Sequence, residues 1–286
     1  MKIELKDYKG QSEIAAGTLK TFDIAMDTMP DKRMRTIRVW LPAQYDGVRR
    51  FPVLYMHDGQ NLFSGLDDAW KWYVDREMKK VPESAQPIVV AIDTAKTRGE
   101  ELCPPWEMTA WFSEKYPFGA PKGEMYRDFV INTLKPLIDE NFMTKPEKEF
   151  TGIGGSSMGG IQSFYMHTSR PDVFGRSLCF SVAFGVSEMA YWRQWVDQHA
   201  DGVLNDRIFL YTGGQTADST IVHPSVELYE RMRDKGMDYH HICLVMDTRE
   251  AHYESGWQKY FAEAVTYLFS QDNSVVLPPK RPQKRG

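Results

Sequence analysis

The sequence lacks the features that mark several classes of protein. Only three of its 286 residues are cysteine, and Cys103, Cys179 and Cys243 are far apart, without metal-type spacing. Such cysteines are typical of buried thiols in a reducing compartment. The chain also has no internal repeat and no linker rich in proline, serine or glycine. We therefore expect one domain over residues 1–270.

Excess charge and long apolar runs are also absent. The formal net charge is -4, so no basic face for nucleic acid is expected. No apolar run approaches the length of a membrane span, and residues 1–7 alternate charged with apolar side chains and contain no signal-peptide core. These absences predict a cytoplasmic protein without a membrane partner. Residues 271–286 form a basic, Pro-rich tail that we expect to be disordered.

Strand-like and helix-like segments alternate along most of the chain. Two β-rich runs, 19–26 and 34–41, flank a turn-type cluster and predict an antiparallel hairpin. Short apolar runs predict strands at 51–56, 88–92, 150–153, 177–182, 207–212 and 241–246. Helical periodicity favours helices at 67–81, 124–142, 161–169, 188–199, 222–235 and 256–270. This alternation predicts an α/β protein with a mainly parallel sheet covered by helices on both faces.

One stretch carries the chemistry: residues 154–160, Gly-Gly-Ser-Ser-Met-Gly-Gly, between a predicted strand and a predicted helix. It fits the pattern G-x-S-x-G only from Gly155, so Ser157 rather than Ser156 is the candidate nucleophile. A Walker loop would need lysine after its last glycine, where this chain has isoleucine, and a dinucleotide loop would follow the first strand. A structural Gly-rich turn remains the alternative.

A serine hydroxyl needs a base, and usually a carboxylate that orients the base. In this arrangement the chain order is serine, acid, histidine. His252, between the last strand and the last helix, is the expected base, with His223 as a weaker alternative. Asp218 is the only carboxylate in the loop after the preceding strand and is the expected acid. Asp247 and Glu250 compete for that role, although residues so close to the histidine in sequence rarely fold back onto it.

Two backbone N–H groups are expected to form an oxyanion hole. One belongs to Met158, the residue after the nucleophile. The other belongs to the turn after the early strand 51–56, where Gln60 is the expected donor.

The long irregular segment 94–123 is rich in aromatic residues. A loop of this length inside a compact domain is usually functional or disordered, and the aromatic content argues against disorder. We expect Trp106, Trp111 and Phe112 to contact substrate, with a packed surface loop as the alternative.

Four segments together resemble one family: residues 54–63, 98–104, 154–160 and 170–175 with the serine that follows at 181. The chain resembles the esterase branch of the α/β hydrolases, which includes enterochelin esterase-like proteins and the feruloyl and acetyl-xylan esterases of carbohydrate esterase family 1. The resemblance implies an α/β-hydrolase fold.

Carried onto this chain, the resemblance implies that Ser157 is the nucleophile, His252 the base, and Met158 and Gln60 the oxyanion donors. Members of the family usually place the acid in the loop of Asp218, but some enterochelin-type members look like Ser–His dyads. The triad and the dyad both stay open.

The expected function is that of a serine carboxylic-ester hydrolase that forms an acyl-enzyme on a small or carbohydrate-linked ester of acetyl or feruloyl type. No metal and no organic cofactor are expected. Alternatives are a siderophore trilactone esterase with the same mechanism, acyl transfer to an alcohol, and a catalytically idle binding protein on a hydrolase fold. The acyl group, the alcohol and the oligomeric state are not specified by the sequence.

Overall fold

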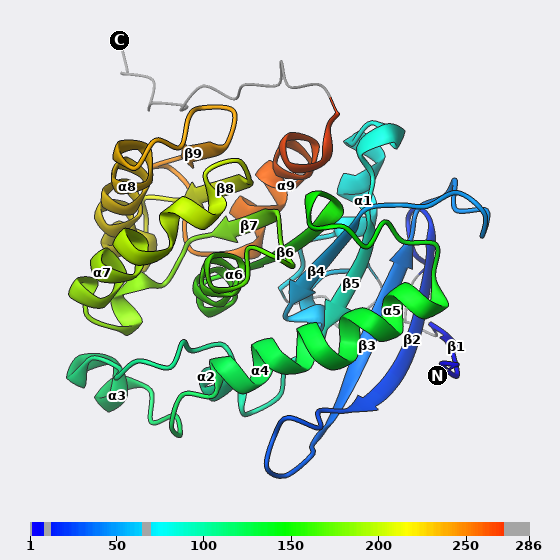
Figure 1. Cartoon of the computed structure of the whole chain (residues 1–286), viewed down its shortest axis with the longest axis horizontal. Coiled ribbons are helices and arrows are strands. Elements are labelled where there is room, and N and C mark those ends of the chain that lie inside the picture. Colours follow the sequence, from blue (N-terminus) through cyan, green and yellow to red (C-terminus); the bar gives the residue numbers. More distant parts are fainter. Residues whose placement is uncertain (1, 9–12, 65–69, 272–286) are drawn as a thin grey trace.

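A computed structural model of the chain describes residues 2–8, 13–64 and 70–271 (Figure 1). Its strands are β1 (Lys6–Asp7), β2 (Thr18–Ala25), β3 (Met34–Leu41), β4 (Val53–His57), β5 (Ile88–Ile92), β6 (Thr151–Ser156), β7 (Arg176–Phe180), β8 (Arg207–Thr212) and β9 (Ile242–Met246). Its α-helices are α1 (Val74–Glu77), α2 (Arg98–Glu101), α3 (Ala110–Lys115), α4 (Gly123–Phe129), α5 (Lys135–Asn141), α6 (Met158–Ser169), α7 (Met189–His199), α8 (Asp218–Asp234) and α9 (Glu254–Phe269). Short 3-10 turns lie at Gly59–Asn61, Met78–Lys80, Glu83–Ala85, Lys148–Phe150, Phe184–Val186 and Ala200–Val203.

The strands form one sheet in the order β1-β2-β3-β5-β4-β6-β7-β8-β9. β2 and β3 make the predicted antiparallel hairpin, and β3 pairs antiparallel with β5. From β5 through β4 to β9 every neighbouring pair is parallel. Because parallel strands end at the same edge, the loops after β4, β6, β8 and β9 gather at the carboxyl edge of the sheet.

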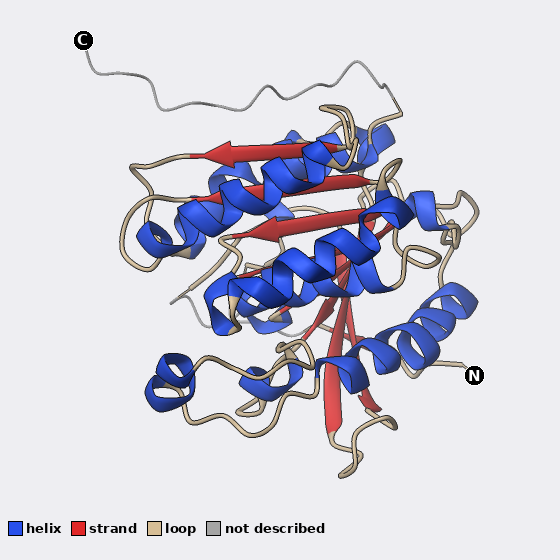
Figure 2. Cartoon of the chain, turned by 60° about the vertical axis from the view of Figure 1, so that its left-hand side comes forward, coloured by secondary structure: helices blue, strands red, loops and turns tan. Residues whose placement is uncertain are grey.

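Helices cover both faces of the sheet (Figure 2). Successive residues of β7 divide between two hydrophobic clusters, with Leu178 and Phe180 in one and Cys179 in the other. The Cys179 cluster is completed by side chains of α4 to α8, and the Leu178 cluster by side chains of α1 and α9. Strands buried on both faces explain the near-continuous apolar runs in the sequence. The predicted α/β-hydrolase type of sheet is confirmed.

Two helices differ in detail from the prediction. The helix predicted from residue 67 begins at Val74, since Tyr73 has a left-handed backbone (φ 50°), and residues 65–69 lie outside the described part. The segment predicted as one kinked helix over 124–142 runs as α4, a π-helical turn at Val130–Leu134, and α5. The π turn directly precedes Pro136, whose ring would clash with a regular preceding turn.

Three further predictions concern the cysteines, the tail and the absence of a membrane span. All three cysteine side chains are buried, as predicted. Apart from residue 271, the predicted disordered tail lies outside the described residues. Within residues 2–8, 13–64 and 70–271, no helix is both long and apolar enough to cross a membrane.

Candidate functional site

Ser157 sits on a strained turn between β6 and α6. Its backbone has φ 56° and ψ -118°, a conformation that is costly for a residue other than glycine. A Cβ atom on Gly155 would lie 3.0 Å from the backbone of Gly159, and one on Gly160 would lie 2.8 Å from the carbonyl oxygen of Phe180. The glycines on both sides of the serine therefore let strand and helix approach closely, as a nucleophile elbow requires.

Asp218 and His252 meet at the same edge of the sheet. The Asp218 Oδ1 atom lies 2.5 Å from Nδ1 of His252. The other carboxylate oxygen of Asp218 accepts hydrogen bonds from the Gly213 backbone N–H at 2.6 Å and the Ser181 hydroxyl at 2.7 Å. The carboxylate is completely buried, and the backbone N–H of His252 donates to Thr216 Oγ1 at 3.0 Å. Asp218 is thus held by several fixed donors and in turn holds the imidazole.

The competing residues have other partners. Asp247 binds Arg249, Lys259 and Tyr260, and its carboxylate oxygens make no contact with His252 in the described part of the chain. Burial acts to raise the pKa of Asp247, but hydrogen bonds from these three residues outweigh it and hold the pKa far below its usual range. Asp247 therefore anchors its loop.

The backbone of Glu250 joins the loops of the acid and the base. Its carbonyl oxygen accepts hydrogen bonds from the backbone N–H groups of Gly214 and Gln215, both at 3.0 Å. His223, the alternative base, is exposed on α8 and is absent from the lining of the Ser157 cavity described below.

Ser157 and His252 line one cavity of about 300 Å³. Its lining residues are Asp58, Gln60, Asn61, Trp70, Trp72, Arg98, Ser156, Ser157, His252, Tyr253, Glu254 and Trp257. Within the described residues no hydrogen bond joins the Ser157 and His252 side chains. Such a contact commonly tightens only when substrate binds.

Of the two predicted oxyanion donors, Met158 follows the serine in the chain and Gln60 lines the same cavity as the serine. Met158 begins α6, and the first N–H groups of a helix have no partner within it. Gln60 belongs to the 3-10 turn Gly59–Asn61 and lines the cavity. Its side chain exchanges two hydrogen bonds of 2.9 Å with Thr94, and its carbonyl accepts one of 2.7 Å from Lys71. These contacts fix the backbone of the turn next to Ser157.

The sequence reasoning did not assign roles to Asp58 and Arg98. The Arg98 guanidinium donates to both carboxylate oxygens of Asp58, at 2.7 and 2.8 Å, and Thr94 adds a bond of 2.7 Å. Burial alone would raise the pKa of Asp58, but Arg98 and Thr94 outweigh it and lower the pKa. Asp58 lies in segment 54–63 and Arg98 in segment 98–104, two of the segments that resemble the esterase family. That resemblance was the signal in the sequence that could have pointed to these residues. Their contact joins the turn Gly59–Asn61 to α2.

The neighbouring His57 is also buried. Its Nδ1 lies 2.8 Å from the Tyr126 hydroxyl, and burial lowers the pKa of His57 to about 4. The imidazole is therefore neutral at pH 7, and it packs against Gly159 at the start of α6. His57 therefore packs under the first turn of α6, next to the turn that carries Ser157.

The three aromatic residues predicted to contact substrate do not line the Ser157 cavity. Trp106 packs against rings of α6 and α7, Phe112 lies in the hydrophobic core, and Trp111 is 61% exposed. The aromatic residues that line the cavity are Trp70, Trp72, Tyr253 and Trp257. The sequence did not predict this set of residues, because they come from two distant segments, the stretch before α1 and the start of α9.

No group of three or more histidine, cysteine, aspartate or glutamate side chains in residues 2–8, 13–64 and 70–271 is arranged to hold a metal ion.

Comparison with known proteins gives consistent matches. Residues 28–268 match the family described as "Putative esterase". The chain is 22% identical over 257 residues to the "Uncharacterized protein YbbA" of Bacillus subtilis (strain 168), covering 85% of this chain and 95% of that protein.

Solved structures show the same fold. A ferulic acid esterase aligns with a TM-score of 0.65 and 15% identity, covering 92% of this chain and 99% of its own. The siderophore hydrolase EstA from Aspergillus nidulans aligns with a TM-score of 0.67 and 14% identity, covering 90% of this chain and 98% of its own. The family match over residues 28–268 shows that the chain belongs to the "Putative esterase" family and is a carboxylic-ester hydrolase with the α/β-hydrolase fold.

Proposed function

We propose that the chain is a serine esterase that forms an acyl-enzyme on a small or carbohydrate-linked ester of acetyl or feruloyl type. The observation that carries the proposal is the 2.5 Å contact between Asp218 and His252, on a cavity that Ser157 also lines. A buried carboxylate that orients an imidazole beside a strained serine is the arrangement that activates a hydroxyl.

In the first half of the reaction, Ser157 Oγ bonds to the ester carbonyl carbon, and its proton passes to Nε2 of His252. Asp218 holds Nδ1–H and stabilises the imidazolium that forms. The backbone N–H groups of Met158 and Gln60 donate to the oxyanion of the tetrahedral intermediate. The C–O bond to the alcohol then breaks, and His252 returns the proton to the leaving oxygen.

In the second half, water enters where the alcohol left. His252 takes a proton from that water as its oxygen bonds to the acyl carbon. The second tetrahedral intermediate uses the same two N–H donors, and its collapse releases the acid as Ser157 regains its proton. This water-dependent half separates hydrolysis from acyl transfer to an alcohol.

A siderophore trilactone ester is less well supported. The word "siderophore" in the name of EstA describes the substrate class of that protein. At 14% identity, its similarity to this chain shows a shared fold and not a shared substrate. Ferric catecholate ligands are anionic, whereas Arg98, the cation that lines the Ser157 cavity, is neutralised by Asp58, and Glu254 adds a negative charge. These charges favour an ester without a negative charge.

The test is hydrolysis of p-nitrophenyl acetate, p-nitrophenyl butyrate, methyl ferulate and acetylated xylo-oligosaccharide by the wild type and Ser157→Ala. Activity on at least one ester is expected in the wild type and is expected to fall by about 10⁴-fold or more in the variant. Ser113→Ala, which changes an exposed serine of α3 outside the cavity, serves as the control and should keep its activity. A fluorophosphonate probe should label the wild type and Ser113→Ala but not Ser157→Ala.

Two results would refute the proposal. If wild type and Ser157→Ala are equally inert and the probe labels neither, the chain is a hydrolase-fold protein without this chemistry. If Ser157→Ala keeps the wild-type rate, another residue is the nucleophile.

A further inference from the structure

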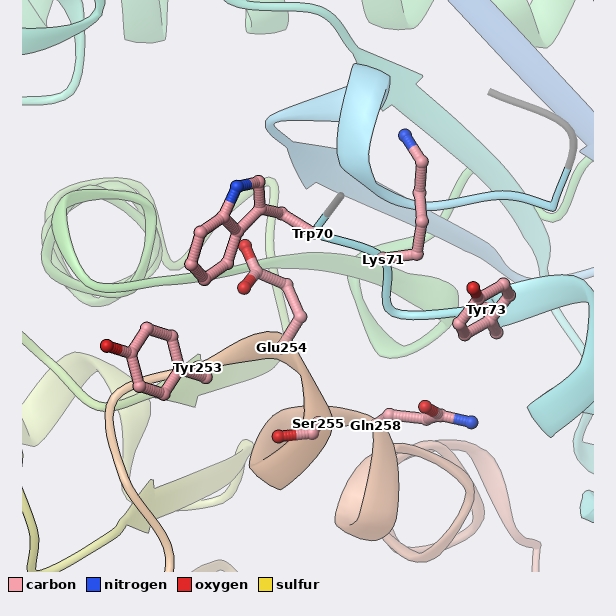
Figure 3. Close-up of a pocket in the computed structure, with 7 residues that line it drawn as sticks. All are labelled: Trp70, Lys71, Tyr73, Tyr253, Glu254, Ser255 and Gln258. Atoms are coloured by element: carbon pink, nitrogen blue, oxygen red, sulfur yellow. The ribbon is translucent and has the colours of Figure 1, made fainter. Parts of the chain in front are cut away.

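A second cavity adjoins the one that contains Ser157. It has a volume of about 400 Å³ and is lined by Trp70, Lys71, Tyr73, Tyr253, Glu254, Ser255 and Gln258 (Figure 3). Trp70, Tyr253 and Glu254 line both cavities. Because the two cavities share these walls, a molecule bound at Ser157 can extend into the second one.

Two aromatic side chains form one wall. The rings of Trp70 and Tyr253 stack with their centroids 5.3 Å apart and their planes 26° apart. Both remain accessible, with 58% and 43% of their surfaces exposed. Large accessible aromatic side chains beside a reactive serine provide apolar contact area for a ligand. They also keep this wall open to solvent, so a ligand can enter from outside.

Glu254 brings a negative charge into this cavity. Glu254 and Trp70 line the same two cavities, and the Lys71 side chain points away from the Glu254 carboxylate (Figure 3). The Lys71 ammonium donates to the Gln60 carbonyl at 2.7 Å, and Arg98 is held by Asp58. In residues 2–8, 13–64 and 70–271, Glu254 forms no ion pair. Burial raises the pKa of Glu254 more than a backbone hydrogen bond and the nearby charges of His252 and Arg98 lower it.

The position of Glu254 identifies the half of the substrate that it meets. His252 gives its proton to the leaving alcohol, so the alcohol lies on the histidine side of the reacting carbon. Tyr253 and Glu254 follow His252 directly in the chain, and both line the Ser157 cavity as well as the second cavity. The second cavity is therefore next to the leaving group.

We propose that the cavity of Trp70, Tyr253 and Glu254 binds the alcohol half of the ester, and that it selects alcohols that carry hydrogen-bond donors and no negative charge. This inference rests on the proposed function. The carboxylate of Glu254 accepts hydrogen bonds from the alcohol, and the aromatic pair packs against its carbon atoms. An anionic alcohol is repelled by Glu254.

The test uses three esters with the same acetyl group and alcohols of nearly equal size: acetoxyacetamide, methyl acetoxyacetate and acetoxyacetate. The amide is neutral and has N–H donors, the methyl ester is neutral and has none, and the carboxylate is anionic. The reaction measured is release of acetate, because methyl acetoxyacetate also carries a methyl ester, and the readout is the ratio of kcat/KM for acetoxyacetamide to kcat/KM for acetoxyacetate. Comparing this ratio between enzyme variants cancels the different intrinsic reactivities of the esters.

In the wild type we expect the ratio to favour acetoxyacetamide, and Glu254→Gln to lower it by roughly tenfold. Glu254→Ser removes the same charge by a different substitution and should lower the ratio by a similar factor. Glu83→Gln removes one negative charge from an exposed residue that lines neither cavity, and should leave the ratio unchanged. The ratio of kcat/KM for acetoxyacetamide to kcat/KM for methyl acetoxyacetate should fall in Glu254→Ser, which lacks the carboxylate acceptor, relative to the wild type.

A ratio that is the same in wild type, Glu254→Gln and Glu254→Ser, all labelled by a fluorophosphonate, would overturn the inference and leave the proposed function intact. A ratio of kcat/KM for acetoxyacetamide to kcat/KM for methyl acetoxyacetate that is the same in wild type and Glu254→Ser would overturn the hydrogen-bond selection. If the wild type hydrolyses none of these esters and none of the four esters named under the proposed function, and the fluorophosphonate does not label it, the proposed function fails and the inference fails with it.

Discussion

The molecule contains two groups made of one serine, one histidine and one aspartate. They are Ser157, His252 and Asp218 at the carboxyl edge of the sheet, and Ser177, His167 and Asp206 at the amino edge. In the second group Nδ1 of His167 lies 2.9 Å from Ser177 Oγ, and Nε2 lies 3.2 Å from Asp206 Oδ2. Judged only by its hydrogen bonds, the second group is the more complete of the two, because its histidine contacts both the serine and the aspartate.

Access and backbone geometry separate the two groups. Ser177, His167 and Asp206 are all buried, and Ser177 is an internal residue of strand β7. Ser157 instead lines a cavity, on a strained turn at the first N–H groups of a helix. Residue types and hydrogen bonds therefore do not identify a reactive site, because substrate must also reach the serine and the oxyanion must find donors.

The charges of the second group favour a structural role. Burial lowers the pKa of His167 more than the hydrogen bond to Asp206 raises it, so the imidazole is neutral at pH 7. For Asp206, burial acts to raise the pKa, but hydrogen bonds from His167 and Lys148 outweigh it and lower the pKa. Lys148 contacts Asp206 at 2.9 Å. The group links α6, β7 and the start of β8.

The same change in each group gives the largest expected contrast. Asp218→Asn should lower kcat on p-nitrophenyl acetate by about 10³–10⁴-fold, because the amide cannot stabilise the imidazolium of His252. Asp206→Asn should change kcat by no more than about threefold but lower the free energy of unfolding in urea by about 1–3 kcal/mol, because the amide weakens the hydrogen bonds to His167 and Lys148. Equal losses of kcat in the two folded variants would contradict the distinction.

The second group should make folding sensitive to acid. The unfolded chain protonates its histidines near pH 6.5, whereas folded His167 resists protonation until a lower pH. Stability is therefore lost as the pH falls below 6.5, by at most about 1.4 kcal/mol per pH unit for this residue. His167→Gln should show a shallower decline in urea unfolding between pH 7 and pH 5. Parallel declines in both proteins would show that His167 is not responsible.

The smallest expected effect concerns the support of Asp218. Ser181 donates to Asp218 and accepts a bond of 2.8 Å from Nε1 of Trp257. Ser181→Ala should lower kcat by roughly tenfold with little change in KM, because the carboxylate loses one donor. Ser225→Ala, a buried serine of α8 whose hydroxyl has no hydrogen-bond partner in the described chain, is the matched control and should keep its kcat. A tenfold rise in KM at constant kcat in Ser181→Ala would instead indicate a role in substrate binding.

Local patterns in the sequence predicted most of the fold and the centre of the site. Apolar runs and helical periods located most elements to within a few residues, since those patterns reflect burial on two faces of a sheet. The glycines around Ser157 and the loops after the last two strands predicted the three residues that the fold gathers at the carboxyl edge. Their catalytic roles remain predictions.

The sequence alone determined the α/β alternation, the sheet and the residues at the ends of its strands, because each depends on neighbours in the chain. Only the tertiary structure decided which side chains line the cavity, replacing Trp106, Trp111 and Phe112 with Trp70, Trp72 and Trp257. It alone also separated Ser157, which is half-buried and lines a cavity, from the fully buried Ser177 of the second group. The physical reason is that cavity walls and burial arise where segments distant in sequence pack together, and no local pattern records those contacts.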